Sequence, residues 1–194
     1  MNETDLNERL HAMFQDMVAV LETTKRGFLT GRQASINEAK TRLGRMLTSN
    51  LPFTEELVKK EAKDEIEKKY LNLLPHLQLM AGIIRNLINE NKKKIESHLL
   101  FTDKAVEEIK HLYSIMEVQL RDTTDYILTR NPHLKMHVEK EMENLIERAA
   151  DYTASHEIRL ITGVCMPKAS YSYIALIDLI RGVSRELTAF AQRL

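Results

Sequence analysis

The stretch HEIRLITGVCMPKASYSYIALIDLIRGVSRE, residues 156–186, contains a helix end, a short loop and a helix start in one run. Gly163 has no Cβ and can adopt the left-handed conformation that ends many helices, and Pro167 discourages continuation of the preceding helix. Beyond the loop, apolar residues recur at spacings of three and four: Tyr173, Ile177, Ile180, Val183, Leu187 and Phe190. This spacing places them on one helical face, so the segment predicts two helices, the second with a stripe that faces a core.

The same helical spacing extends through the rest of the chain. The sequence has six glycines, four prolines and no convincing alternating strand pattern, so we predict an all-α protein. Apolar stripes predict three helices in residues 1–98 and three in residues 99–194, and the third helices have comparable spacing. The chain is therefore expected to be a duplication, with two pseudo-symmetric antiparallel three-helix bundles.

Prolines and capping residues predict the helix boundaries. Pro52 should interrupt or bend the second helix, and Thr54 is then expected to cap a new one. Pro75 lies inside a long apolar pattern, which predicts a kink or a helix that starts there. Further boundaries are expected before Gly27 or Gly31, near Ser35, after Thr102 and at Asn131–Pro132.

Composition excludes several classes of protein. The 28 basic and 28 acidic residues cancel, and no aromatic and basic interleaving is present, so nucleic-acid binding is not expected. No apolar run reaches the roughly 20 residues that a transmembrane helix needs. The polar start Met1–Asp5 does not resemble a signal peptide, which predicts a cytoplasmic location. The single cysteine, Cys165, excludes an internal disulfide and has no base that the sequence reveals, so it is expected to be structural.

The order His-x-Ile-Arg-Leu-x-x-Gly-x-Cys-x-Pro, followed by Tyr173 and the apolar helix, resembles the last two helices of PhoU-like domains. Such domains occur as phosphate-transport regulators and as cytoplasmic tails of sodium/phosphate cotransporters. The similarity of sequence motifs covers residues 133–190. The similarity of the expected helix arrangement covers nearly the whole chain. The resemblance implies the two-bundle fold described above and a regulatory function that depends on partner proteins.

The PhoU-like resemblance also implies a metal signature, Leu-Glu-Arg-Ile-x-Asp, whose two acids this chain has lost. Arg181 and Arg185 stand at the acidic positions of the sixth helix, while Gln78 and Gly82 stand at those of the third. Guanidinium groups donate hydrogen bonds and offer no lone pairs to a metal, so we expect no metal at these positions. Four nearby acids are instead expected to act as counter-charges to the arginines: Asp122, Asp125, Glu139 and Glu143.

Two other patterns permit metal binding. His133, His137 and Glu141 are spaced by four on one helical face, although no fourth ligand is evident and ordinary surface packing is the favoured interpretation. Two Glu-x-x-His steps, from Glu8 and from Glu108, match di-iron bundles only in spacing. His111 lies off its apolar stripe, so these steps are interpreted as solvated helix edges.

No catalytic motif is found, so we predict an interaction protein rather than an enzyme. By resemblance, its partners are a phosphate-transporter component or a sensor kinase, at the periphery of a membrane transporter. A homodimer is also expected, because Ile83, Ile88, Ile115 and Val118 lie off the main stripes. The alternatives are a metal-binding helical carboxylate protein that holds iron, manganese or magnesium, and a purely structural helical interaction domain.

Overall fold

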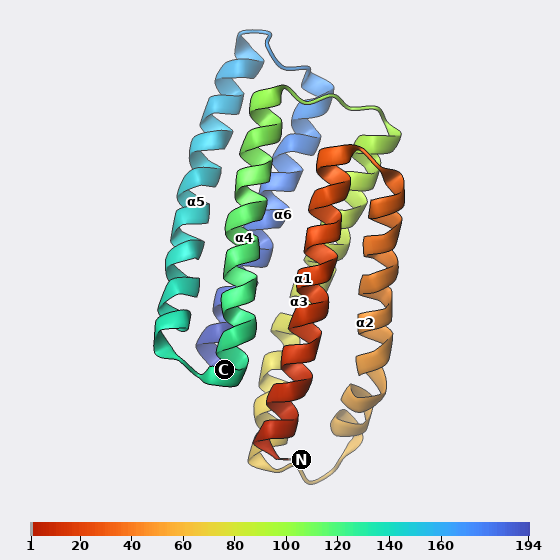
Figure 1. Ribbon diagram of the computed structural model, residues 1–194, viewed down its shortest axis with the longest axis vertical. Helices are drawn as coiled ribbons and strands as arrows, with labels where there is room; N and C mark the ends of the chain where they lie inside the picture. The colour runs from red at the N-terminus through yellow and green to blue at the C-terminus, as the bar shows by residue number, and fades with distance from the viewer. Residues whose placement is uncertain (1) are drawn as a thin grey trace.

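The computed structural model describes residues 2–194, and these form six helices and no strand (Figure 1). The all-α prediction is therefore confirmed. The helices are α1 (Glu3–Thr30), α2 (Gln33–Lys59), α3 (Glu65–Glu96), α4 (Asp103–Thr129), α5 (Pro132–Ile161) and α6 (Pro167–Arg193).

Local side-chain chemistry sets most of the helix ends. The Thr102 side chain accepts a hydrogen bond from the amide of Ala105 and so caps α4, as the sequence predicts. Pro132 and Pro167 occupy the first positions of α5 and α6, where the missing N–H is harmless. Helix α1 passes Gly27 and ends at Gly31, whose φ of 64° is the left-handed conformation that suits glycine.

Two prolines lie inside helices, which corrects part of the boundary prediction. Helix α2 continues through Pro52, and the Thr54 hydroxyl donates to the carbonyl of Asn50 at 3.1 Å instead of capping a new helix. Helix α3 likewise continues through Pro75. Buried residues lie on both sides of each proline, such as Met46 and Leu57 in α2. Their packing outweighs the roughly 3 kcal/mol that an internal proline costs.

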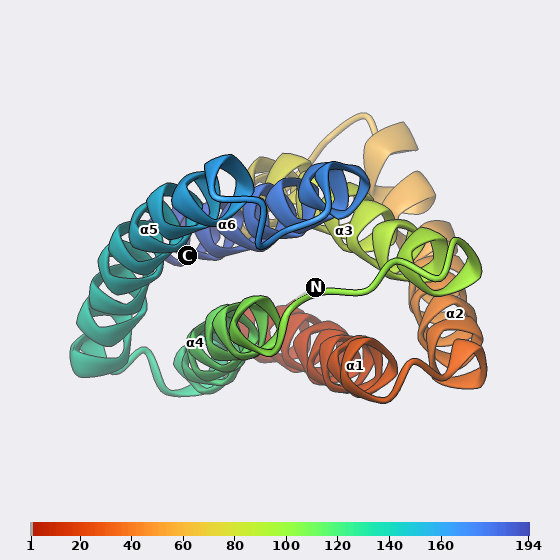
Figure 2. The same ribbon diagram turned by 90° about the horizontal axis from the view of Figure 1, so that it is seen from above.

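The helices form two layers with one further helix at each side (Figure 2). Helices α1 and α4 make one layer and α3 and α6 the other, while α2 covers one side and α5 the opposite side. Contacts between α1 and α4 show that these helices run antiparallel: Lys25 pairs with Glu117 at 2.7 Å, and Glu22 pairs with Arg121. Each half of the chain thus contributes one helix to each layer.

The two halves of the chain share one hydrophobic core. It includes buried residues from all six helices, and rings from opposite ends of the chain meet, as Phe14 and Phe190 do at a centroid distance of 4.7 Å. Large apolar side chains between the two layers therefore hold residues 2–98 and 99–194 together. Within residues 2–194, none of the helices has a window apolar enough to cross a membrane.

The shared core also accounts for the apolar residues that lie off the main stripes. Ile88 and Ile115 are buried within the chain, and Ile83 packs against the core and against Gly182 of α6. Only Val118 of this group is exposed. Because three of the four side chains pack within the chain, they no longer supply a reason for a homodimer, which stays a prediction.

Because the core is continuous, we expect one cooperative unfolding transition for both halves. Phe190→Ala should lower the free energy of unfolding by about 3–5 kcal/mol, since it opens a cavity where the two halves meet. Urea titration followed by circular dichroism and by tyrosine fluorescence measures both quantities. Leu128→Ala, at an exposed position of α4, is the matched control and should change stability by less than about 0.5 kcal/mol. Two separate transitions would contradict the shared core.

Candidate functional site

The junction of α5 and α6, residues 156–173, turns through a hydrogen-bonded helix end. Gly163 has a φ of 73°, its amide donates to the carbonyl of Leu160 at 3.2 Å, and the amide of Val164 donates to the carbonyl of Arg159 at 2.9 Å. This pair of bonds is the Schellman arrangement, which satisfies carbonyls that a helix end leaves free. The glycine predicted to end the helix does so, and the α5–α6 junction has a defined backbone.

A buried ion pair fixes this junction to α4. The guanidinium of Arg159 donates to both carboxylate oxygens of Glu108, at 3.0 and 2.6 Å. The Glu108 side chain is 2% exposed and that of Arg159 is 14% exposed. The hydroxyl of Tyr173 donates to the same carboxylate at 2.6 Å. Arginine, tyrosine and glutamate from three helices therefore form one polar network at the base of the junction.

The surroundings of Arg159 and Tyr173 set the protonation state of each side chain. Burial alone would lower the pKa of Arg159, but its hydrogen bonds and charge interaction with Glu108 raise that pKa above its ordinary value. Burial, followed by the neighbouring Glu108 carboxylate, raises the pKa of Tyr173, so the phenol stays protonated and donates. Two charges in a dry site cost desolvation energy, and only the bidentate geometry and the added tyrosine offset it.

His156 connects the polar network to the loop. Its ring stacks on Tyr173 at a centroid distance of 4.3 Å, and its Nε2 lies 2.9 Å from the hydroxyl of Ser170. Its Nδ1 lies 3.8 Å from Sγ of Cys165. The sequence revealed no base for Cys165, and the structure places this imidazole beside it. The residues of the sequence motif, His156, Arg159, Cys165 and Tyr173, therefore contact one another.

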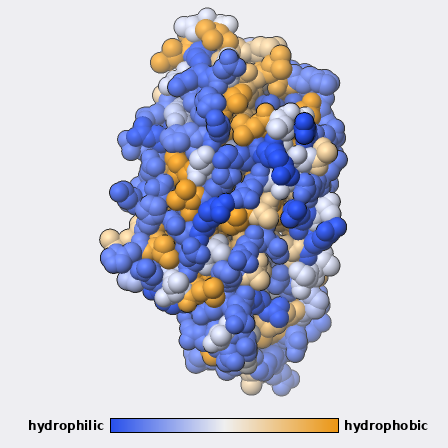
Figure 3. Space-filling view, viewed as in Figure 1, coloured by the Kyte–Doolittle hydropathy of each residue, from blue (hydrophilic) through white to orange (hydrophobic). Residues whose placement is uncertain are grey.

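Apolar side chains cover the outside of the junction. Five large side chains from this stretch are more than 60% exposed: Ile158, Ile161, Val164, Met166 and Tyr171. We call these five residues the tip patch. Elsewhere in residues 2–194, only Leu100 and Met136 among the large apolar residues reach that exposure. Figure 3 shows hydrophobic side chains at the top of the molecule, where the α5–α6 turn lies in Figure 1. Monomeric surfaces rarely gather apolar side chains this way without a partner.

The four positions at which the sequence resemblance expects lost acids come to the same stretch of the antiparallel α3–α6 pair. His76 meets Glu186 at 2.7 Å, and Ile83 packs on Gly182, so these two contacts bracket Gln78 and Gly82 on α3 and Arg185 on α6. The adjoining Arg181 pairs with Asp178 of its own helix at 3.1 Å. Arg185 is exposed, and no ion pair of it is found within residues 2–194.

The four acids that the sequence suggested as counter-charges have other surroundings. Asp122 lies 2.5 Å from Nδ1 of His137, and Glu139 accepts a hydrogen bond from Gln192 at 3.1 Å. Asp125 and Glu143 are exposed. None of these acids forms an ion pair with Arg181 or Arg185 in the described part of the chain.

The other suggested metal ligands are only partly assembled. His137 lies between Asp122 and Glu141, whose Oε1 is 3.5 Å from its Nε2, while His133 is exposed at the start of α5. Across residues 2–194, no group of three or more histidine, cysteine or acidic side chains has a geometry that could hold a metal ion. His11 is half-buried and His111 bonds the hydroxyl of Tyr152 at 2.6 Å.

Sequence reasoning missed the role of Glu108. It was interpreted as part of a solvated helix edge, but its side chain is buried and paired with Arg159. Its position gave the signal: Ala105, Glu108 and Leu112 follow the spacing of three and four that marks the buried stripe of α4. A glutamate on a buried stripe requires a cation, and Arg159 supplies it.

Comparison with protein-family models, curated proteins and solved structures finds no match to this chain.

Breaking the buried pair from one side should destabilise the fold strongly. Glu108→Leu leaves the Arg159 guanidinium without its anion, and we expect a loss of about 3 kcal/mol, the lower end of the range because Arg159 keeps some exposure. The double variant with Arg159→Leu should cost less than the sum of the two single changes. A double-mutant cycle in urea measures this, with Glu107→Leu as the exposed control on the same helix. Strict additivity would show that the pair carries no coupling energy.

His156 predicts a pH dependence of stability. Burial, followed by the charge of Arg159, lowers its pKa below the ordinary 6.5, so the unfolded chain binds this proton more readily. The stability that the neutral ring contributes is present above pH 6.5 and is lost as the pH falls from there through the lowered pKa. Between pH 7.5 and pH 5, His156→Gln should therefore lose less stability than the parent chain. Urea titrations across that range test it, and equal slopes would contradict the prediction.

Proposed function

We propose that this chain is a PhoU-like regulatory domain that acts by binding partner proteins through the tip patch, and that it belongs to a phosphate uptake system. One combination of features supports the binding part of this proposal. Five exposed apolar side chains stand on a turn that a buried ion pair fixes in place. The phosphate part rests on the resemblance of residues 133–190 to PhoU-like domains.

Preorganisation explains why the apolar side chains and the buried network belong together. A flexible loop loses conformational entropy when it binds, whereas a turn already held by Gly163, Arg159 and Tyr173 loses much less. The network contacts only the inner side of the junction, which leaves Ile161 and Val164 free on the outer side. A charged pair that stabilises the fold little in net terms is therefore useful here because it orients a surface.

The arrangement of the helices is consistent with the two-bundle part of this proposal. Helices α1, α2 and α3 contact one another, and α4, α5 and α6 do the same. The central contacts, α1 with α4 and α3 with α6, join helices of the same rank in each half. We propose that these halves are the two pseudo-symmetric repeats of a PhoU-like domain, residues 1–98 and 99–194.

The proposal is tested by placing charges on the tip patch. In a cell that contains the cognate phosphate transport system, the double variant Ile161→Asp, Val164→Asp should lose co-purification with the transporter's ATPase or its sensor kinase. Loss of a central apolar contact costs at least about 2 kcal/mol, or roughly 30-fold in affinity. Phosphate uptake should lose its regulation in parallel. Circular dichroism verifies that the variant is folded.

Met136→Asp is the matched control, because Met136 is about as exposed as Val164 but lies on α5 away from the tip patch. It should keep both partner binding and regulation. Retention of partner binding by the double variant would show that the tip patch is not the binding surface. Unchanged phosphate uptake in a strain that lacks the chain would refute the phosphate assignment independently.

A further inference from the structure

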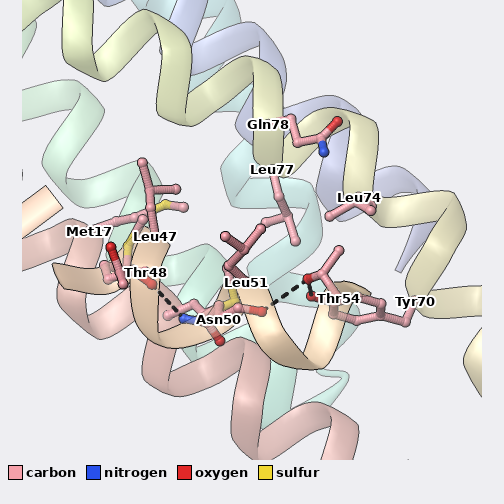
Figure 4. Close-up of a pocket in the computed structure, with 12 residues that line it drawn as sticks. Met17, Leu47, Thr48, Asn50, Leu51, Thr54, Tyr70, Leu74, Leu77 and Gln78 are labelled. Atoms are coloured by element: carbon pink, nitrogen blue, oxygen red, sulfur yellow. Dashed lines mark hydrogen bonds between the residues drawn. The ribbon is translucent and has the colours of Figure 1, made fainter. Parts of the chain in front are cut away.

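A separate apolar pocket lies in the first half of the chain, between α1, α2 and α3 (Figure 4). Its volume is about 230 Å³, and its deep wall consists of buried side chains: Met13, Met17, Met46, Tyr70 and Leu77. In Figure 1 this region lies near the lower end of the bundle, whereas the α5–α6 turn lies at the top. The pocket is therefore independent of the tip patch.

No charged side chain lines this pocket in the described part of the chain. A carboxylate or an ammonium group bound there would lose its hydration without gaining a counter-ion, which costs far more than a short apolar chain can offset. The methionines offer a flexible and polarisable wall that adapts to an aliphatic chain. The pocket thus selects a neutral ligand.

Three hydroxyls line the pocket: that of Thr48 is exposed and donates to the carbonyl of Gly44 at 2.9 Å, whereas those of Thr54 and Tyr70 are less exposed and face the polar end of a ligand. The Thr54 hydroxyl donates to the carbonyl of Asn50 at 3.1 Å and lies 3.2 Å from the hydroxyl of Tyr70. Thr54 has a single hydroxyl proton, so Tyr70 is the donor between the two. Both oxygens then offer lone pairs and neither has a proton left; dashed lines in Figure 4 mark these two hydrogen bonds. At these two oxygens a ligand must therefore supply the hydrogen-bond donor, while the exposed amide of Gln78 is a protein donor elsewhere in the lining.

The volume limits the length of the apolar part. A cavity of about 150 Å³ holds benzene, which corresponds to about 25 Å³ for each carbon atom. On that ratio a pocket of 230 Å³ holds about nine non-hydrogen atoms. The exposed side chain of Leu51 extends the apolar wall at the rim.

We propose that this pocket binds a medium-chain neutral amphiphile, an aliphatic chain of about eight carbons that ends in a hydroxyl group. The chain lies against Met13, Met17, Met46 and Leu77, and the hydroxyl donates to the oxygen of Tyr70 or Thr54. Such a ligand contacts all three helices of the first half, so it stabilises the folded chain in proportion to its concentration.

The experiment uses the full chain and octan-1-ol, with sodium octanoate at pH 7.5 as the charged probe of equal length. Isothermal titration calorimetry should show saturable binding of one octan-1-ol, and octanoate should bind at least about tenfold more weakly, because it is charged and has no donor. Leu77→Trp fills the pocket and should abolish octan-1-ol binding. Leu79→Trp, on the exposed face of the same helix, is the matched control and should bind as the parent does.

Thr54→Val tests the polar contact with little change in shape and serves also if Leu77→Trp does not fold. It removes one acceptor, and we expect octan-1-ol to bind about three- to tenfold more weakly. The proposal is overturned if octan-1-ol shows no saturable binding, if Leu77→Trp leaves that binding unchanged, or if octanoate binds as tightly as octan-1-ol. Since the tip patch plays no part in this assay, its outcome is distinct from that of the partner-binding test.

Discussion

Four helices of this protein carry apolar side chains on more than one face, and the rest of the structure depends on burying them. A three-helix set can cover only one stripe of each helix, so the second faces of α1, α3, α4 and α6 must meet one another. Phe14 against Phe190 and Ile83 against Gly182 are contacts of this kind. The two layers of Figure 2 follow from that need, and α2 and α5 then cover the open sides.

Packing in this shared core leaves few places for charge, which makes the buried pair of Glu108 and Arg159 informative. An apolar pair of similar volume would hold the helices together at least as well. The ion pair instead fixes direction: two parallel N–H to oxygen bonds and the hydroxyl of Tyr173 allow only one orientation of the α5–α6 junction. A single orientation of the α5–α6 junction keeps the side chains of the tip patch in one arrangement on its outer side.

The two candidate binding features differ in chemistry and in place. The tip patch projects outward from a rigid turn and suits another protein surface, whereas the pocket between α1, α2 and α3 is recessed and lined by flexible methionines. One lies at the end of α5 and the other near the start of α3, at opposite ends of the bundle. The shared core nevertheless includes residues of both halves, so the side chains around the pocket belong to the same cluster as those of α6.

The sequence by itself determined the elements. Helical spacing identified the stripe from Tyr173 to Phe190, all of it buried, and local chemistry identified Gly163, Thr102 and Pro132 at helix ends, because these signals act over a few residues. It also identified the segment from His156 to Tyr173 as the one to examine. It misjudged Thr54 as a cap and an interruption at Pro52, where burial on both sides of the proline overrode a local breaking signal.

Only the tertiary structure decided which residues meet across helices. Glu108 and Arg159 are 51 positions apart, and nothing local couples them; the packing of α5 on α4 brings them together. The same packing placed Asp122 beside His137 rather than beside the arginines of α6, and it placed His156 beside Cys165. Spacing tells which face of a helix a residue occupies, but the partner on that face depends on where the neighbouring helices lie.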